Sequence, residues 1–144
     1  MALLKQFEGF SPTIYKCPAG LPTIGYGHVI KASETFPDRQ ITQKQAEILL
    51  KQDVNVFLAA VREAVTVEIN QNQLDALVCL AYNIGIQAFE KSTLLRHLNA
   101  GNAPKAAMEF RKWVFCKGQR LPGLLTRRNA EANLFTRKRP FMEL

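Results

Sequence analysis

The sequence predicts an α+β protein that is mainly α-helical. Between residues 13 and 30, short β-prone pieces alternate with turns that contain Gly and Pro. From residue 42 onwards, apolar residues recur at helical spacing, and several of these runs follow residues that cap helices. The length of 144 residues is typical of one domain, which we expect to span 1–144, with a β-rich part over about 12–40 and a helical part over about 42–144.

The N-terminal third is expected to hold one short helix and a small sheet. Residues 2–9 read as a helix because their apolar side chains fall on one face, and Gly9 and Pro12 end it. Residues 13–30 predict an antiparallel hairpin or a three-stranded sheet. A polar loop is expected over 31–41.

Helices are expected in the rest of the chain. Thr42 and Gln45 form a capping box, with Ile41 as the preceding hydrophobic residue, so a long helix is predicted over about 43–63. A second box at 70–73 opens a strongly apolar helix over about 71–84, which should be central and buried. Three shorter helices follow, from Ser92 to 99–101, from Pro104 to about Trp113, and over about 124–136, with a loop over 118–123 before the last.

The composition limits the classes of function. The net charge of +7 indicates either a plain basic surface or attraction to a polyanion, such as a bacterial envelope or nucleic acid. Zinc-finger spacing and aromatic RNA-binding signatures are missing, and the basic cluster 137–139 is weak evidence alone. No apolar run approaches the roughly 18 residues of a membrane span. Residues 1–5 are too short for a signal peptide, so either a partner releases the protein or an N-terminal segment is missing here.

The three cysteines, Cys17, Cys79 and Cys116, do not suggest a disulfide framework, because their number is odd. Cys79 lies in an apolar run and should be a core residue, whereas Cys116 could lie in the core or in a loop. No pair has the spacing of a metal site, and we expect neither a metal nor another cofactor.

Glu8, Cys17 and Thr23 form the most informative pattern in the chain. Eight residues separate the first two, and five separate the last two. A lone Glu near a helix end is usually a solvated residue, but apolar neighbours favour the protonated carboxyl that a glycosidase uses as an acid. A Thr hydroxyl can donate and accept at once, and so can position a water. A thiol is a poorer base than a carboxylate unless its surroundings favour the thiolate.

Residues 7–28 closely resemble the active-site segment of the phage-type lysozymes, whose spacing is E-x8-(D or C)-x5-T. The resemblance continues over about nine tenths of the chain. It includes the helix 73–85, which ends in Tyr82-Asn83-Ile84-Gly85, and the segments 92–95, 113–114 and 121–128.

The resemblance implies a two-lobed lysozyme-like fold that hydrolyses the β-1,4 bond between N-acetylmuramic acid and N-acetylglucosamine. It implies that Glu8 is the general acid, that Cys17 stands where the family has Asp or Cys, and that Thr23 helps to hold the water. It further implies roles for residues that orient Glu8 or line the sugar cleft. The orienting residues are His28 and Arg127, or its neighbour Arg128, and the cleft residues are Tyr82 and Asn83.

These observations favour an endolysin, an inverting muramidase that acts on peptidoglycan glycan strands and binds the anionic cell envelope. We expect a monomer without nucleic acid, held in the host cytoplasm and acting in the periplasm or cell wall; holin-dependent release is one route. There are three alternatives. A transglycosylase would use Glu8 but no hydrolytic water, against which Cys17 and Thr23 argue. The others are a non-catalytic wall-binding protein of the same fold and a basic nucleic-acid-binding protein.

Overall fold

The computed structural model describes residues 2–137. The chain divides into two compact units, and the first contains the chain up to Val56 together with Cys116–Gly118. The second contains Phe57–Phe115 and the chain from Gln119 onwards. The division therefore falls at residue 56, whereas the expected β-rich and helical parts met near residue 41. The two units are described separately below.

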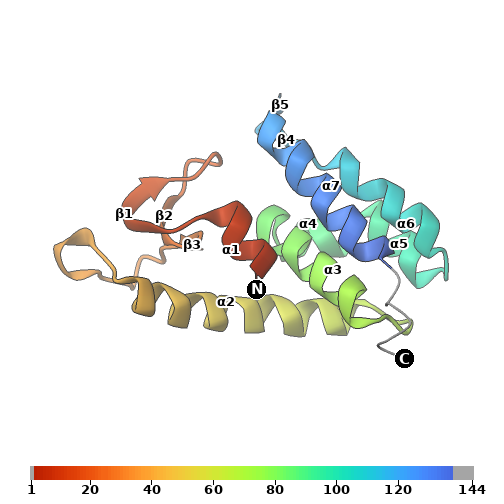
Figure 1. Ribbon diagram of the computed structural model, residues 1–144, viewed down its shortest axis with the longest axis horizontal. Coiled ribbons are helices and arrows are strands. Elements are labelled where there is room, and N and C mark those ends of the chain that lie inside the picture. Colours follow the sequence, from red (N-terminus) through yellow and green to blue (C-terminus); the bar gives the residue numbers. More distant parts are fainter. Residues whose placement is uncertain (1, 138–144) are drawn as a thin grey trace. The chain divides into compact units, whose positions relative to one another are not determined.

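The first unit begins with the helix α1 (Ala2–Glu8) and a small antiparallel sheet (Figure 1). The sheet contains β1 (Ser11–Lys16), β2 (Pro22–Gly25) and β3 (His28–Val29) in the order β1-β2-β3, so the three-stranded alternative is confirmed. Thr23 on the central strand pairs with Tyr15 on one side and Val29 on the other.

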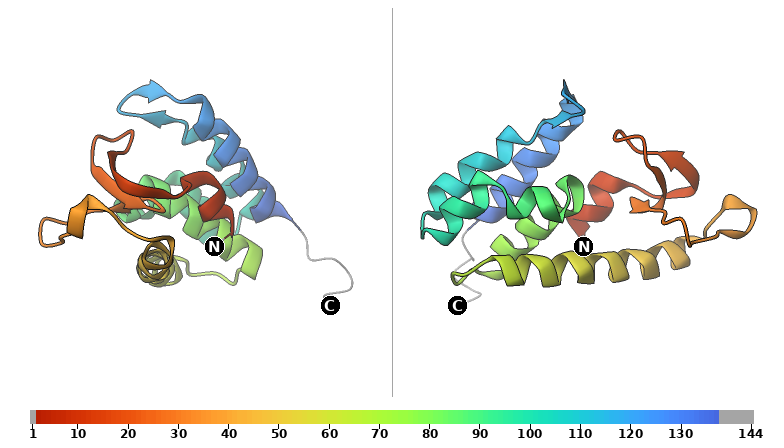
Figure 2. Two further views of the ribbon diagram at one scale, coloured as in Figure 1. Left: turned by 60° about the vertical axis from the view of Figure 1, so that its left-hand side comes forward. Right: turned by 180° about the vertical axis from the view of Figure 1, so that it is seen from behind.

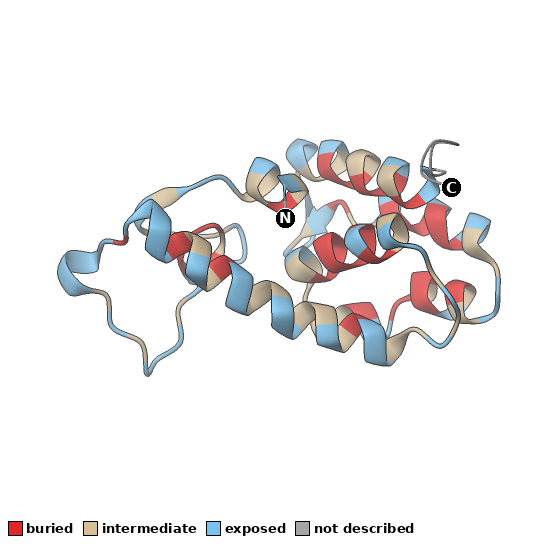
Figure 3. Cartoon of the chain, turned by 60° about the horizontal axis from the view of Figure 1, so that its bottom comes forward, coloured by how far each residue is buried: buried red, intermediate tan, exposed pale blue. Residues whose placement is uncertain are grey.

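The loop after the sheet contains a short 3-10 turn, η1 (Pro37–Arg39), and leads into the long helix α2 (Gln43–Ala64). The predicted capping box is present: the Gln45 amide donates to the Thr42 hydroxyl at 3.1 Å, and the Thr42 amide donates to the Gln45 side chain at 2.9 Å. The left view of Figure 2 looks nearly along α2. Figure 3 shows α2 mostly exposed or intermediate, with few buried positions.

The core of the first unit forms where α1, the sheet and the start of α2 meet. The Gly25 backbone packs against the side chain of Ala46, so β2 lies directly on α2. The buried apolar side chains are Leu4, Ile24, Tyr26, Ile41, Ala46 and Leu50. This core fixes both ends of the segment that carries Glu8, Cys17 and Thr23.

The second unit is helical. Its elements are α3 (Gln71–Ile84), α4 (Ile86–Glu90), α5 (Thr93–Asn99), α6 (Ala103–Glu109), the 3-10 turn η2 (Phe110–Lys112) and α7 (Pro122–Thr136). The helix α3 packs against α7, and α5 packs against α6. As predicted, α3 is buried almost all round, and Cys79 is one of its core residues.

The cap predictions for these helices are confirmed. Asn70 and Gln73 form the capping box of α3, and the Ser92 side chain accepts a hydrogen bond from the Leu95 amide at the start of α5. Pro104 lies in the first turn of α6.

Three short elements were not expected. The helix α4 has only five residues, too few to show a periodic pattern. The strands β4 (Phe115–Cys116) and β5 (Gln119–Arg120) pair where a plain loop was predicted. Lys117 and Gly118 both have positive φ, the geometry of tight hairpin turns, and α7 then begins earlier than predicted, at Pro122.

In residues 2–137 no helix is both long and apolar enough to cross a membrane.

Candidate active site

Cys17 lies in the tight turn that joins β1 to β2. The Gly20 amide donates to the Cys17 carbonyl at 2.7 Å, and the Cys17 amide donates to the Leu21 carbonyl at 3.0 Å. Burial raises the pKa of the thiol, but hydrogen bonds from the turn's backbone and from the Thr23 side chain lower it, so the pKa lies below the ordinary value. The backbone groups belong to Leu21, Ala19 and Gly20. The turn therefore favours the thiolate.

Thr23 follows the turn on β2 and is only 1% exposed. Its hydroxyl donates to the Leu21 carbonyl at 2.9 Å and also lies within hydrogen-bonding reach of the Cys17 thiol. Because a hydroxyl has a single proton, it can donate to one of these acceptors at a time. While it donates to Leu21, the hydroxyl can accept a hydrogen bond from the protonated thiol. When Cys17 is ionised, the hydroxyl can donate to the thiolate instead.

Glu8 is the last residue of α1 and is half-buried. Its carboxyl group packs against the backbone of Gly27: a Cβ added at Gly27 would lie 2.9 Å from both Cδ and Oε2 of Glu8. Gly27 also has a φ of +78°, which other residues rarely adopt. The glycine therefore sets how closely the turn between β2 and β3 approaches the predicted acid.

Tyr15 connects the two ends of the motif. Burial raises the pKa of its phenol, and the negative charges of Glu8 and then Cys17 raise it further. The pKa of Tyr15 is therefore affected by both ionisable groups of the motif, Glu8 and Cys17. Sequence reasoning missed Tyr15, although the antiparallel pairing of β1 with β2 puts it opposite Thr23, where side chains share one face of the sheet.

His28 lies at the start of β3 and is buried. Its Nδ1 is 2.7 Å from Asp53 Oδ2 on α2, and its Nε2 is 3.0 Å from both carboxylate oxygens of Glu34. The hydrogen bond to Asp53 is the main cause that raises the pKa of His28, burial opposes it, and Glu34 adds to the rise. Both ring nitrogens thus bind carboxylates that the sequence did not single out, and the expected role of His28 towards Glu8 stays a prediction.

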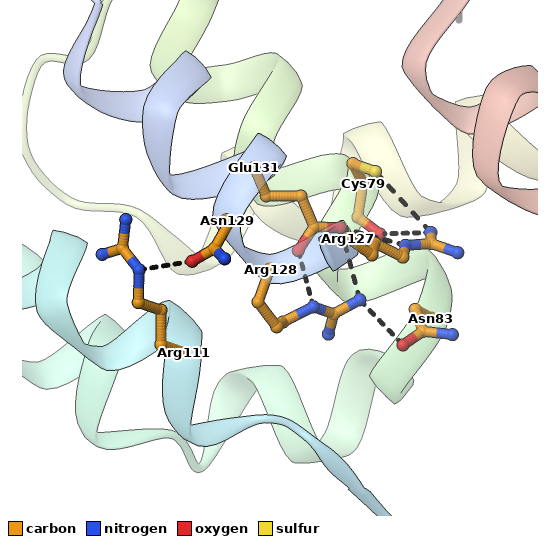
Figure 4. A network of polar contacts seen from close by, with 7 residues as sticks. All are labelled: Cys79, Asn83, Arg111, Arg127, Arg128, Asn129 and Glu131. Carbon is orange, nitrogen blue, oxygen red and sulfur yellow. Dashed lines mark hydrogen bonds and ion pairs between the residues drawn. The ribbon is translucent and has the colours of Figure 1, made fainter. Parts of the chain in front are cut away.

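Arg127 belongs to the second unit, where it joins a buried polar network between α3 and α7 (Figure 4). Its Nε is 3.1 Å from Glu131 Oε2, and its Nη2 donates to the Cys79 carbonyl at 3.0 Å. Arg128 and Glu131 are fully buried, with Arg128 Nε 2.8 Å from Glu131 Oε1. The expected contact of Arg127 or Arg128 with Glu8 stays a prediction.

Tyr82 and Asn83 lie in the last turn of α3, in the same unit as Arg127. The ring centroids of Tyr82 and Phe57 are 5.1 Å apart. Asn83 is exposed, and its Oδ1 accepts a hydrogen bond from Arg128 at 2.8 Å. The predicted residues therefore form two groups, one in each unit: Glu8, Cys17, Thr23 and His28 in the first, and Tyr82, Asn83 and Arg127 in the second.

Comparison with known proteins gives consistent results. Residues 5–131 match the phage lysozyme family. An endolysin of Bacillus phage B103 is 44% identical over 135 residues, which are 92% of this chain and 51% of that protein. The chain therefore spans about half the length of this relative. An endolysin of Acyrthosiphon pisum secondary endosymbiont phage 1 is 43% identical over 94% of this chain and 93% of its own.

Among solved structures, the muramidase domain of SpmX from Asticaccaulis excentricus superimposes with a TM-score of 0.83 at 37% sequence identity, covering 95% of this chain and 94% of that one. The family match, the identities and the shared fold point to the same family. The chain belongs to the phage lysozyme family.

Proposed function

We propose that this protein is an endolysin that hydrolyses the β-1,4 bond between N-acetylmuramic acid and N-acetylglucosamine in bacterial peptidoglycan. The observation that carries the proposal is the placement of a carboxyl group, a thiol and a buried hydroxyl on one small sheet and its ends: Cys17 lies in the turn between β1 and β2, Thr23 follows it on β2, and Glu8 packs against Gly27 after β2. The relatives described above, named endolysin and muramidase, support the same function.

In the proposed mechanism Glu8 donates its proton to the glycosidic oxygen as the bond to the anomeric carbon breaks. The Cys17 thiolate takes a proton from a water molecule, which Thr23 helps to hold, and the water oxygen bonds to the anomeric carbon. The thiol then loses its proton to solvent, and Glu8 regains one. Attack by water from the opposite face inverts the anomeric centre, so the first product is the α-anomer.

The other predicted residues have supporting roles in this proposal. His28 supports the position of the segment beside Glu8, through Asp53 and Glu34. Arg127 orients Glu8, and Tyr82 and Asn83 contact the sugars. The basic chain, with a net charge of +7, favours binding to the anionic envelope. We further propose that the protein acts as a monomer in the periplasm or cell wall, after holin-dependent release from the cytoplasm.

Glu8→Gln tests the proposal, because it keeps the shape of the side chain and removes the acidic proton. General acid catalysis contributes about 10²–10⁴-fold, so clearing of permeabilised Gram-negative cells should slow by at least that factor while the melting temperature holds. Glu68→Gln, at an exposed position, is the control and should clear cells like the wild type. A Glu8→Gln protein that clears cells at the wild-type rate would contradict the role of Glu8 as the general acid. NMR of the first product tests inversion separately, and a β-anomer would contradict it.

A further inference from the structure

The end of α3 carries an exposed amide whose orientation is set by buried charges. Asn83 is exposed, whereas Arg128 and Glu131, to which it is linked, are both 0% exposed. Glu131 binds Arg128 through both oxygens, with Oε1 2.8 Å from Nε and Oε2 3.4 Å from Nη2. The same Nη2 then donates to Asn83 Oδ1 at 2.8 Å.

This linkage leaves Asn83 one orientation. A guanidinium only donates hydrogen bonds, so the atom of Asn83 that faces Arg128 has to be the carbonyl oxygen. A flipped amide would point its own N–H groups at a buried cation. Figure 4 shows the amide nitrogen on the side turned away from Arg128. The exposed end of α3 therefore presents a hydrogen-bond donor.

We propose that Arg128, held by Glu131, is a positioning residue that fixes Asn83 as a donor to an acetamido carbonyl oxygen of the glycan strand; this rests on the function proposed above. A sugar hydroxyl both donates and accepts, and so would be served by either end of an amide. An acetamido carbonyl only accepts, so it needs a donor, and the fixed orientation of Asn83 always presents one. The network thus secures one contact to an N-acetyl group that a flipped amide would lose.

Asn83→Asp is the sharpest test. The carboxylate keeps an oxygen towards Arg128, in a charge-assisted bond, so the melting temperature should hold or rise. The outward group becomes an acceptor, so KM for soluble peptidoglycan fragments should rise roughly tenfold, the effect of one hydrogen bond, with kcat nearly unchanged. Asn133→Asp on α7 makes the same charge change at another exposed site and should leave KM unchanged.

A double-mutant cycle tests whether Arg128 acts through Asn83. Asn83→Ala should raise KM about as much as Asn83→Asp, and Arg128→Lys, which keeps the charge but not the planar donor, should raise KM as well. The two changes combined should raise KM no more than Asn83→Ala alone. Additive effects in the cycle, or wild-type KM in Asn83→Asp, would overturn the inference. If Arg128→Lys does not fold, Asn83→Asp decides alone: a raised KM at an unchanged melting temperature supports the inference, and a wild-type KM overturns it.

These outcomes separate the inference from the function on which it rests. A wild-type protein that fails to cleave peptidoglycan fragments contradicts the proposed function itself. A wild-type protein that cleaves them, together with an Asn83→Asp protein of equal KM, contradicts only the role of Asn83 and Arg128.

Discussion

At Cys17 the turn between β1 and β2 gathers hydrogen bonds from three backbone amides and from the Thr23 hydroxyl around one thiol. Each of these bonds stabilises the charged form, which offsets the cost of burial. A thiol in this setting reaches the thiolate state at lower pH than an isolated cysteine. The turn thus supplies what a cysteine needs to take the place of a carboxylate base.

The pH dependence of activity should report this thiol. If Cys17 must be ionised, kcat should rise with pH through a midpoint below 9.0, the ordinary value for a thiol. In Cys17→Asp that midpoint should fall by several units, towards about 3.9. Cys17→Ala, the control without lone pairs, should lose most activity at every pH. A Cys17→Ala protein of wild-type activity, or an unmoved midpoint in Cys17→Asp, would remove Cys17 from the mechanism.

The sequence predicted Glu8, Cys17 and Thr23 because their spacing is local and can be read from one segment. Asp53 and Glu34 could not be found in this way, because they meet His28 only after α2 and the loop pack around β3. Tyr15 could have been predicted from the sequence, since its place opposite Thr23 follows from the register of the predicted hairpin. What sequence reasoning lacked was the pairing register, not the residue types.

Two glycines with positive φ have different neighbours: Gly25 ends β2, and Gly27 lies in the turn between β2 and β3. Gly25→Ala would place its Cβ 3.1 Å from the Ala46 Cβ, whereas Gly27→Ala would place it 2.9 Å from the Glu8 carboxyl carbon. Both changes should cost stability by roughly 1–2 kcal/mol for the left-handed backbone. Only Gly27→Ala should also displace the acid.

Activity per folded molecule is the measurement that separates these two variants. It should fall by at least about tenfold in Gly27→Ala, since small displacements of reacting groups are costly, and it should stay near wild type in Gly25→Ala. Equal activity per folded molecule in both variants would show that Gly27 affects only the backbone.

His28 joins three elements, because it links β3 to Asp53 on α2 and to Glu34 in the loop that follows β3. Its pKa is raised above 6.5, so its stabilising effect is complete below that pH and is lost as the pH rises through the folded pKa. Burial raises the pKa of Glu34, but the Lys31 amide and His28 lower it below 4.5. The stabilising effect of the Glu34 carboxylate is therefore present above pH 4.5, and it is lost as the pH falls through the folded pKa. The combined effect is therefore largest between pH 4.5 and 6.5.

Thermal unfolding of His28→Gln against pH should show this window. The loss of stability should reach roughly 1.5–3 kcal/mol inside it, the range for hydrogen bonds to charged groups, and should shrink towards pH 9. His97→Gln on α5 removes the other histidine and is the control. A loss for His28→Gln that does not change with pH would mean that the ring acts by packing alone.

Elements that begin with a side-chain cap were predicted well, because the cap and its partner lie three residues apart. The helices α2, α3 and α5 begin where Thr42, Asn70 and Ser92 place them. The helix α4 and the β4–β5 hairpin were missed, because elements of two to five residues are too short for a period.

The net charge of the whole chain should attract the protein to its substrate before any single residue contacts that substrate. A net charge of +7 attracts the protein to an anionic envelope, and salt screens that attraction over a Debye length that falls from about 10 Å at 0.1 M to about 3 Å at 1 M. Clearing of permeabilised cells should therefore slow as salt rises across this range. Cleavage of short soluble glycan fragments, which carry few charges, should change much less. An equal effect of salt on both substrates would argue against the envelope's role.

The proposed use of a thiol as the base would allow catalytically competent molecules to be counted. A thiolate is the nucleophile that attacks an alkylating reagent, so Cys17 should react well before Cys79, whose pKa is raised by burial in α3. With half-buried Cys116 replaced by Ser, one equivalent of alkylating label should mark each molecule whose turn is correctly formed. A preparation could then be titrated by its label, and its rate expressed per working molecule, which a carboxylate base at the same position would not permit.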